Sequence, residues 1–233
     1  MAKNLAQGAP ERRTRSDGER TRRAILETAV RLATVEGLER LSIGRLAEES
    51  GVSKSGLFAH FRSKERLQVA TIEAAREIFV REIIAPAEAA LVPRERIEQL
   101  CERFLSYVER LVFPGGCFFA VAAAEVGARP GPVRERIAKY QRQWMQLLEH
   151  NVAEAQATGL LDDAPASQIA FECNALLIAA NTAFILHGDR TALDRARCAI
   201  RARLRPRGEN ADTVPSYRSS KNDILGKAPS RDV

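Results

Sequence analysis

Apolar residues recur three and four positions apart through most of the chain, from about residue 18 to residue 205. This spacing places them on one face of a helix, and no segment shows the alternation of a half-buried strand. The pattern therefore predicts an all-helical (all-α) protein with about nine helices. The predicted helices span approximately residues 18–36, 42–50, 53–62, 64–85, 93–113, 117–128, 133–158, 165–189 and 191–204.

Residues that start or stop helices stand at the borders of these segments. Ser16 and Glu19 have the spacing of a capping box, so the first helix is expected to begin near Ser16. Gly37 and Gly159 follow apolar runs, as helix-ending glycines do. Pro86 lacks the N–H that a helix interior needs, so it is expected to end the fourth helix.

Residues 41–67 predict two short helices joined by a sharp turn and followed by the start of a third. Ser42 and Ser53 stand where the first N–H groups of each short helix need a side-chain acceptor. Gly51 supplies the left-handed backbone that the turn requires. Leu57 faces inward while its polar neighbours face solvent. This arrangement is a helix-turn-helix, whose second helix lies in the major groove of DNA.

Residues 51–67 read GVSKSGLFAHFRSKERL, which resembles the signature of the TetR family of one-component transcriptional regulators. Residues 21–43 read TRRAILETAVRLATVEGLERLSI and resemble the family's first helix and its link to the second. The resemblance implies a three-helix DNA-binding domain followed by a larger helical domain for ligand binding and dimerisation. It also implies a repressor that binds a palindromic operator in double-stranded DNA as a homodimer and is released by a small-molecule effector of unknown identity.

The two ends of the chain differ in composition from its middle, because they are polar and interrupted by Gly, Pro or Ser. We therefore expect a disordered basic arm at 1–17 and a disordered tail at 206–233. Between them we expect a helix-turn-helix domain at 18–66 and a helical effector-binding and dimerisation domain at 67–205.

The exposed side of the predicted recognition helix carries groups that suit DNA. Lys54 can donate to a guanine or a phosphate, and Lys64 stands at a helix N-terminus that favours an anion. Gly56 permits close approach to the groove floor, or tight packing between helices. Phe58 replaces the tyrosine common in the family, so only ring contact remains. The residues expected to contact DNA are Ser42, Lys54, Ser55, Gly56, Phe58, Ala59, His60 and Lys64.

Net charge supports this location for the DNA-binding surface. The whole chain carries +6, and residues 1–66 hold 14 Lys/Arg against 9 Asp/Glu, a net charge of +5. The remaining residues are nearly neutral. Surplus basic charge is often merely solvated, but its coincidence with the helix-turn-helix favours contact with phosphates.

The long helical domain suggests a ligand pocket and a subunit interface. Aromatic residues at helical spacing either line such a pocket or pack in the core, and both interpretations stay open. The candidate pocket residues are Phe104, Tyr107, Phe118, Tyr140, Trp144 and Asn174. The last two helices are apolar enough to pair with their symmetry mates, or to pack only within their own subunit. The candidate interface residues are Ala170, Leu177, Ile178, Asn181, Phe184, Ala196, Ile200 and Leu204.

The sequence lacks the residue spacing of an enzyme or a metal site. Its three histidines and four cysteines form no nucleophile–base pair and no C-x-x-C motif, so we expect no catalysis, cofactor or metal. Cys117 lies near a predicted helix start, where a thiolate would be stabilised. A regulator controlled by thiol oxidation or by a protein partner, rather than by a small ligand, is therefore the alternative.

No part of the sequence predicts contact with a membrane. The longest apolar stretch, residues 175–186, is interrupted by polar residues and is shorter than a bilayer requires. The N-terminus contains no apolar stretch of the kind found in signal peptides. A cytoplasmic location is expected.

Overall fold

The computed structural model describes residues 10–159, 161 and 163–205, and every regular element in that part of the chain is a helix. The all-α prediction is confirmed. The expected tail at 206–233 and the first nine residues of the expected arm lie outside the described residues. The elements are α1 (Pro10–Glu36), α2 (Ile43–Ser50), α3 (Lys54–Phe61), α4 (Lys64–Phe79), the π-helical η1 (Val80–Ile84), α5 (Ala85–Glu88), α6 (Pro93–Glu109), α7 (Phe118–Val126), α8 (Pro132–Ala157), α9 (Ala166–His187) and α10 (Arg190–Arg203).

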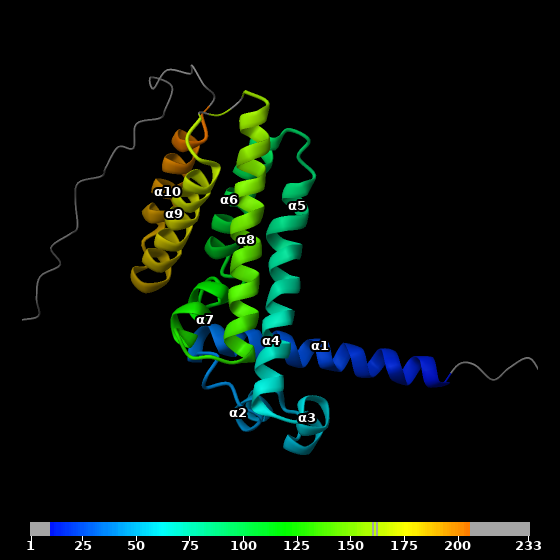
Figure 1. Ribbon diagram of the computed structural model, residues 1–233. Coiled ribbons are helices and arrows are strands. Elements are labelled where there is room, and N and C mark those ends of the chain that lie inside the picture. The colour runs from blue at the N-terminus through cyan, green and yellow to red at the C-terminus, as the bar shows by residue number, and fades with distance from the viewer. Residues whose placement is uncertain (1–9, 160, 162, 206–233) are drawn as a thin grey trace, which may run out of the picture.

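The helices form a small unit at one end of the molecule and a larger bundle (Figure 1). Helices α1, α2 and α3 lie at one end of the molecule, and α4 rises from them into the larger part. There α6, α8, α9 and α10 form a bundle, while α7 lies near its base beside α1. Contacts of α1 with α4 and α7 join the small unit to the bundle.

Helix α1 begins at Pro10, earlier than expected. Proline is favoured at the first helical position, because its missing N–H would be unpaired there anyway and its φ angle already suits a helix. Ser16 and Glu19 therefore lie inside α1, and the expectation of disorder is wrong for residues 10–17. The helix ends at Glu36, just before Gly37, as predicted.

The two short helices of the small unit are closed by the predicted caps. Ser42 Oγ accepts a hydrogen bond from the Arg45 N–H at 3.1 Å, and Ser53 Oγ accepts one from the Gly56 N–H at 3.1 Å. Gly51 ends α2 with a left-handed φ of 68°. A serine cap contributes about 1 kcal/mol to helix stability, so these contacts define the turn through local chemistry.

Pro86 does not end the fourth helix, contrary to expectation. The chain continues through η1 into α5 and stops at Glu88. In η1 the ladder widens, and the Ala85 N–H donates to the Val80 carbonyl five residues earlier. This wider turn accommodates a residue without an N–H, which an α-helical turn does not. The resulting irregular segment faces the bundle interior at Ile83, which is fully buried.

Helix α9 is the most apolar element of the bundle. It has 22 residues, and an 18-residue stretch of it has a mean hydropathy of 1.7, which by length and composition is enough to cross a membrane. The helix is therefore longer than the interrupted stretch 175–186 suggested. It packs against α8 and α10, however, and its Asn181 side chain is buried. Such contacts are those of a core helix in a bundle.

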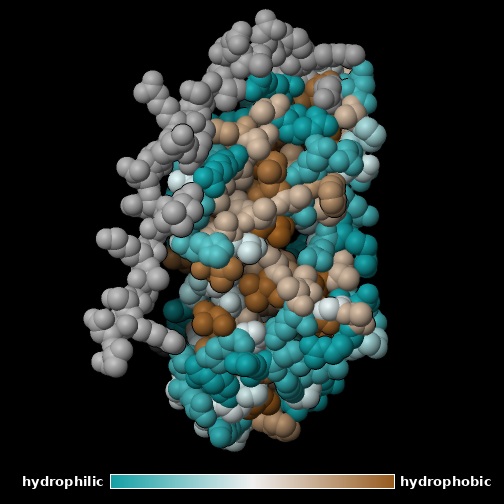
Figure 2. Space-filling model, turned by 90° about the vertical axis from the view of Figure 1, so that its left-hand side faces the viewer, coloured by the Kyte–Doolittle hydropathy of each residue, from teal (hydrophilic) through white to brown (hydrophobic). Residues whose placement is uncertain are grey.

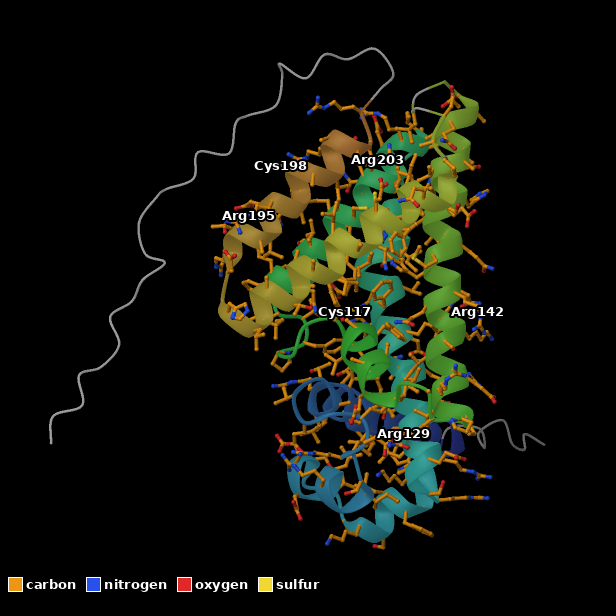
Figure 3. The ribbon with its side chains drawn as sticks, turned by 60° about the vertical axis from the view of Figure 1, so that its left-hand side comes forward. Cys117, Arg129, Arg142, Arg195, Cys198 and Arg203 are labelled. Carbon is orange, nitrogen blue, oxygen red and sulfur yellow. The ribbon has the colours of Figure 1, made fainter. Side chains whose placement is uncertain are left out.

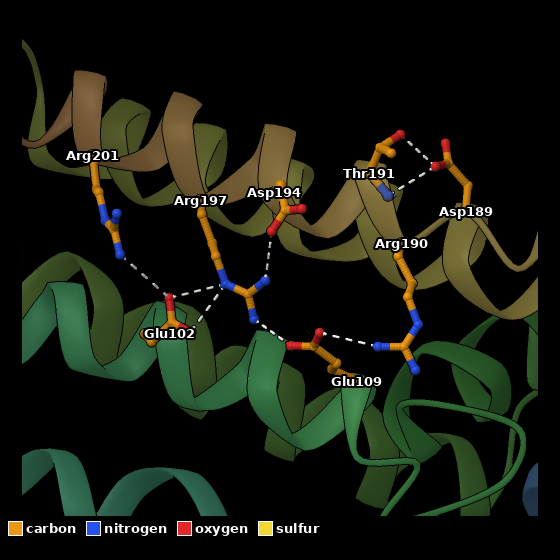
Figure 4. Close-up of polar contacts among 8 residues, drawn as sticks. All are labelled: Glu102, Glu109, Asp189, Arg190, Thr191, Asp194, Arg197 and Arg201. Atoms are coloured by element: carbon orange, nitrogen blue, oxygen red, sulfur yellow. Dashed lines mark hydrogen bonds and ion pairs between the residues drawn. The ribbon is translucent and has the colours of Figure 1, made fainter. Parts of the chain in front are cut away.

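An ion-pair network fixes α10 onto α6 (Figure 4). The Arg197 guanidinium lies 3.0 Å from Glu102 Oε1, 2.7 Å from Glu109 Oε2 and 3.0 Å from Asp194 Oδ1. Burial alone would lower the pKa of Arg197, but its hydrogen bond to Glu109 and the charge of Glu102 raise it. The α9–α10 pair is thus held to the bundle by charge as well as by apolar packing.

Candidate DNA interface, ligand cavity and subunit interface

Helix α3 presents most of the predicted DNA-contacting residues to solvent at the outer end of the molecule (Figure 1). Leu57 and Phe61 hold the helix against the small unit, and both are buried. The opposite side is open. The exposed residues of the predicted set are Lys54, Ser55, Phe58, Ala59, His60 and Lys64, while Ser42 and Gly56 are half-buried.

Packing within the protein explains why position 56 is a glycine, whether or not DNA is bound. A Cβ at this position would lie 3.1 Å from Ser53 Oγ and 3.4 Å from Val52 Cγ1. The turn before α3 therefore packs closely on the Gly56 backbone, as the alternative of tight packing predicts. Close approach to a groove would be an additional role.

The N-termini of α2 and α4 flank the recognition helix. Ser42 already caps α2, and Ser63 Oγ caps α4 by accepting from the Arg66 N–H at 3.1 Å. Lys64 Nζ lies 3.8 Å from Glu39 Oε2, and both side chains are exposed. Exposed pairs of this kind contribute little, so Lys64 remains available to an anion at these helix ends.

A cavity of about 360 Å³ lies among α4, η1, α6, α7, α8 and α9. Of the six predicted pocket residues, four lie on its wall: Phe104, Tyr140, Trp144 and Asn174. Trp144 Nε1 donates to Asn174 Oδ1 at 3.0 Å, and the indole stacks on Phe104 with ring centroids 6.2 Å apart. These contacts fix the orientation of the indole.

Tyr107 and Phe118 do not line the cavity, so that part of the prediction is wrong. Each is 1% exposed and belongs to the solid core beside the cavity. The Tyr107 ring packs edge-on against Phe79 at 6.1 Å and Phe113 at 5.9 Å. Helical spacing identifies the inward side of a helix, but it does not tell a packed neighbour from an empty space.

The cavity also has walls that the sequence did not reveal. Phe79 and Ile84 come from the α4–η1 segment, Phe119 comes from α7, and Arg76 carries a charge at the opening. Ile178, which was predicted at the subunit interface, lies on this wall instead. The segments that meet here are far apart in sequence, and no local pattern records their meeting.

Cys117 lies on the cavity wall, where α7 meets the bundle (Figure 3). Burial raises the pKa of its thiol to about 11, although N–H groups at the start of α7 act in the opposite direction. The expected stabilised thiolate is therefore wrong, because desolvation outweighs the helix N-terminus. The other described cysteines are free thiols too.

Helix α7 connects the cavity to the helix-turn-helix unit. The Glu125 carboxylate accepts hydrogen bonds from the Leu38 N–H at 2.6 Å and the Glu39 N–H at 2.9 Å. A Cβ on Gly115 would lie only 1.7 Å from the Thr34 carbonyl oxygen, so the loop before α7 presses on α1. One short helix thus contacts the cavity on one side and the link between α1 and α2 on the other. We call these contacts of Glu125 the Glu125 clamp.

The predicted interface residues on α9 and α10 are not free to form an interface. Seven of the eight are buried within their own subunit, so the alternative of internal packing holds. Asn181 is one example, because its Oδ1 accepts from the Cys117 N–H at 2.9 Å. Apolar residues surround α9 on every side, and the sequence therefore did not tell which stripe is covered. The buried seven are Ala170, Leu177, Asn181, Phe184, Ala196, Ile200 and Leu204.

A different stripe of α9 is apolar and exposed. Phe171 is 61% exposed and Leu186 is 70% exposed, and Ala175, Ala179 and Thr182 lie between them at helical spacing. We call these five residues the outer α9 face. Figure 2 views the molecule from this side and shows apolar surface gathered over the bundle, above a hydrophilic lower end. An uncovered apolar stripe of this kind is a candidate interaction surface.

An exposed recognition helix, capped by serines and joined by one long helix to a bundle with a cavity, defines a helix-turn-helix transcriptional regulator. Similarity to known proteins agrees with this class. Residues 25–71 match the family model "Bacterial regulatory proteins, tetR family", and residues 93–200 match "Tetracyclin repressor-like, C-terminal domain". The chain belongs to the TetR family of transcriptional regulators.

Individual relatives resemble the chain to different extents. The nucleoid occlusion factor SlmA of Marinobacter nauticus is 31% identical over 139 residues, which are 59% of this chain and 67% of SlmA. The chain spans only 26% to 40% of several other curated relatives. A TetR regulator from Chloroflexus aurantiacus has a TM-score of 0.75 at 26% identity, covering 82% of this chain and all of the other. AibR, solved with isovaleryl coenzyme A and operator DNA, has a TM-score of 0.67 at 23% identity over 80% of this chain and all of AibR, which shows the fold alone.

Proposed function

We propose that this protein is a cytoplasmic repressor that binds a palindromic operator as a homodimer and is released by a small molecule in the cavity. The observation that carries the proposal is the position of α7. Phe119 and Ala120 of α7 line the cavity, while Glu125 of the same helix holds the backbone between α1 and α2. A change in the cavity wall therefore has a direct mechanical path to the DNA-reading unit.

On the DNA side, Lys54 is proposed to read a base from the first turn of α3. Its exposed ammonium group stands where recognition helices reach the edges of bases. Ala59 would meet a thymine methyl group. Ser42, His60 and Lys64 would hold phosphates on either side, which fixes the position of α3 in the groove.

Dimerisation is proposed to use the outer α9 face. One helix-turn-helix contacts only a few base pairs, so strong and selective binding needs two units on adjacent half-sites. Phe171 and Leu186 lie at the two ends of the stripe, with small residues between them that allow close approach of a second α9. Pairing across a two-fold axis would bury the stripe and set the distance between the two copies of α3.

In the proposed switch, ligand binding favours a conformation in which α7 and the Glu125 clamp have moved. The two recognition helices would then no longer fit adjacent half-sites, and DNA affinity would fall. AibR, which has the same fold, forms a complex with isovaleryl coenzyme A and operator DNA. Control by thiol oxidation is less favoured, because burial keeps Cys117 protonated.

The proposal is tested by selecting bound sequences from a random DNA pool and measuring the mass of the resulting complex. We expect a palindromic sequence bound by two copies of the chain. Compounds that alter the fluorescence of Trp144 are then screened for release of that operator. Binding of a single copy, or cavity ligands that never change DNA affinity, would contradict the proposal.

A further inference from the structure

Charge is distributed unevenly around the cavity. Among the described residues that line it, Arg76 is the only charged one, and it is an exposed residue on α4 at the opening. Its guanidinium carbon lies 5.2 Å from the centroid of the Tyr140 ring. The deeper wall is largely apolar and aromatic, with Phe79, Phe119 and Trp144 among its members.

The positive charge of Arg76 is not matched by a neighbouring acid. Glu73 lies one turn earlier on α4, but its two carboxylate oxygens are taken by Arg136 and by the Tyr140 hydroxyl. Within the described residues, Arg76 itself forms no ion pair. A guanidinium held over an aromatic ring at the opening of an apolar cavity is a ready partner for a carboxylate, which it can bind through two parallel hydrogen bonds.

Asn174 offers a second polar group on the same wall. Its Oδ1 accepts from Trp144 Nε1 at 3.0 Å, which leaves the two N–H donors of its amide for another acceptor. No described residue accepts from that amide nitrogen. The cavity therefore presents a cation and a neutral donor within an otherwise apolar, ring-lined space.

The size of the cavity limits the ligand. Its volume of about 360 Å³ is that of roughly a dozen water-sized groups, at ~30 Å³ each. A molecule with a single ring or a medium acyl chain and one polar end matches this volume. A flat aromatic wall also favours stacking or edge contacts with a ring.

We propose that the effector is a small carboxylate with an apolar aryl or acyl body, whose carboxylate binds Arg76 and whose body packs among Phe79, Phe119 and Trp144. The inference rests on the proposed function only in calling this ligand the effector. The binding preference itself is a property of the cavity and can be measured without DNA.

The fluorescence of Trp144 provides the test, because the chain contains one tryptophan and it lines the cavity. The probes are 3-phenylpropionate and octanoate, each paired with its uncharged amide of the same size. Wild-type protein and the Arg76→Gln variant are each titrated with every probe. Arg142→Gln is the matched control, since Arg142 is exposed on α8, does not line the cavity and projects away from the bundle (Figure 3).

We expect wild-type protein and Arg142→Gln to bind at least one carboxylate roughly tenfold more tightly than its amide, because a charge-assisted bidentate pair replaces a neutral contact. Arg76→Gln should lose this preference while binding the amide unchanged. Equal binding of acid and amide by wild-type protein, a preference that survives in Arg76→Gln, or no binding of any probe would overturn the inference.

Operator release separates this inference from the proposed function. If a carboxylate binds through Arg76 but leaves DNA affinity unchanged, the ligand class stands and the repressor switch fails. If only uncharged compounds bind the cavity and release the operator, the switch stands and the ligand class is wrong.

Discussion

The helix-turn-helix unit and the bundle are stabilised by contacts of different range. In the unit, helices of eight residues are closed by serine caps three residues from their partners and by one left-handed glycine. In the bundle, helices of up to 26 residues pack side by side, and partners such as Trp144 and Asn174 are thirty positions apart. The unit is thus specified locally, whereas the bundle can leave a cavity or an uncovered stripe wherever distant faces fail to meet.

The two regions also differ in what a substitution should do. A change on the exposed side of α3 should alter DNA recognition and little else, because that side of the helix faces solvent. A change in the bundle should act at a distance, through the subunit interface or through α7. Substitutions in the two regions test this contrast.

The largest effect is expected from charges on the outer α9 face. The double substitution Phe171→Glu and Leu186→Glu should leave the subunit folded, because both side chains are exposed, but should prevent pairing. Loss of the second half-site contact should weaken operator binding by about 1,000-fold, which is the low end of the ratio of specific to non-specific affinity. Sedimentation and operator titration measure both effects.

The matched control for this double substitution is Leu91→Glu, an apolar residue that is 91% exposed and lies outside the outer α9 face. It should leave the mass and the operator affinity unchanged. A protein that remains dimeric with both glutamates in place would show that the subunits pair elsewhere.

On the DNA side, Lys54→Ala should cost about 1–3 kcal/mol of operator binding and relax discrimination at one base pair. Lys64→Ala should instead weaken binding to specific and random DNA alike and reduce the salt dependence of binding, because Lys64 is proposed to contact a phosphate. Titrations against operator and random duplexes at two salt concentrations distinguish the two roles. Equal losses on both duplexes for Lys54→Ala would remove it from base reading.

Removing the Glu125 clamp should uncouple the helix-turn-helix unit from the bundle. Glu125→Ala leaves the N–H groups of Leu38 and Glu39 without their acceptor, which should cost about 1–3 kcal/mol in the free energy of unfolding. It should also reduce the effect of a cavity ligand on operator affinity. Glu149→Ala, at an exposed position on α8, is the control. Full ligand response with the clamp removed would place the coupling elsewhere.

The local stability of the unit is tested at its cap. Ser53→Ala should lower the free energy of unfolding by about 1 kcal/mol, since the Gly56 N–H loses its acceptor. Ser167→Ala in the first turn of α9 should have almost no effect, because that serine is exposed and α9 has no side-chain cap. Chemical denaturation of both variants gives the comparison, and similar losses would argue against a special role for the cap.

The smallest effect is expected from the thiol of Cys117. With a pKa raised to about 11, it should alkylate slowly at pH 7 and about tenfold faster with each pH unit until that pKa is reached. Half-buried Cys198 should react first. Mass spectrometry of alkylated peptides follows both. Rapid modification of Cys117 at neutral pH, with loss of operator binding, would instead support the hypothesis of control by thiol oxidation.

The sequence predicted the parts of the molecule that local chemistry defines. The caps at Ser42 and Ser53, the turn at Gly51 and the inward Leu57 were found as expected. Local rules also gave wrong predictions where the backbone could adopt another conformation. Pro86 was accommodated by a π-helical turn instead of ending the helix.

Long-range packing accounts for the remaining differences. Phe104 and Tyr107 lie one turn apart on α6, yet the first lines the cavity and the second is core, because Phe113 and Phe79 surround the Tyr107 ring. On α9, periodicity did not show whether Leu177 or Phe171 would be covered. The contact of Glu125 with Leu38, in the link between α1 and α2, spans 87 positions, and no motif indicates it. These features depend on which faces meet, which a single sequence does not state.

The central claim is that the cavity and the DNA-reading surface are coupled, and reciprocity tests it most directly. A cavity ligand, identified by its effect on Trp144 fluorescence, is titrated into the protein with and without saturating operator. If the coupling exists, operator must weaken ligand binding by the same factor by which ligand weakens operator binding, and we expect this factor to be about fivefold or more. Identical ligand affinity in the presence and absence of operator would contradict the account.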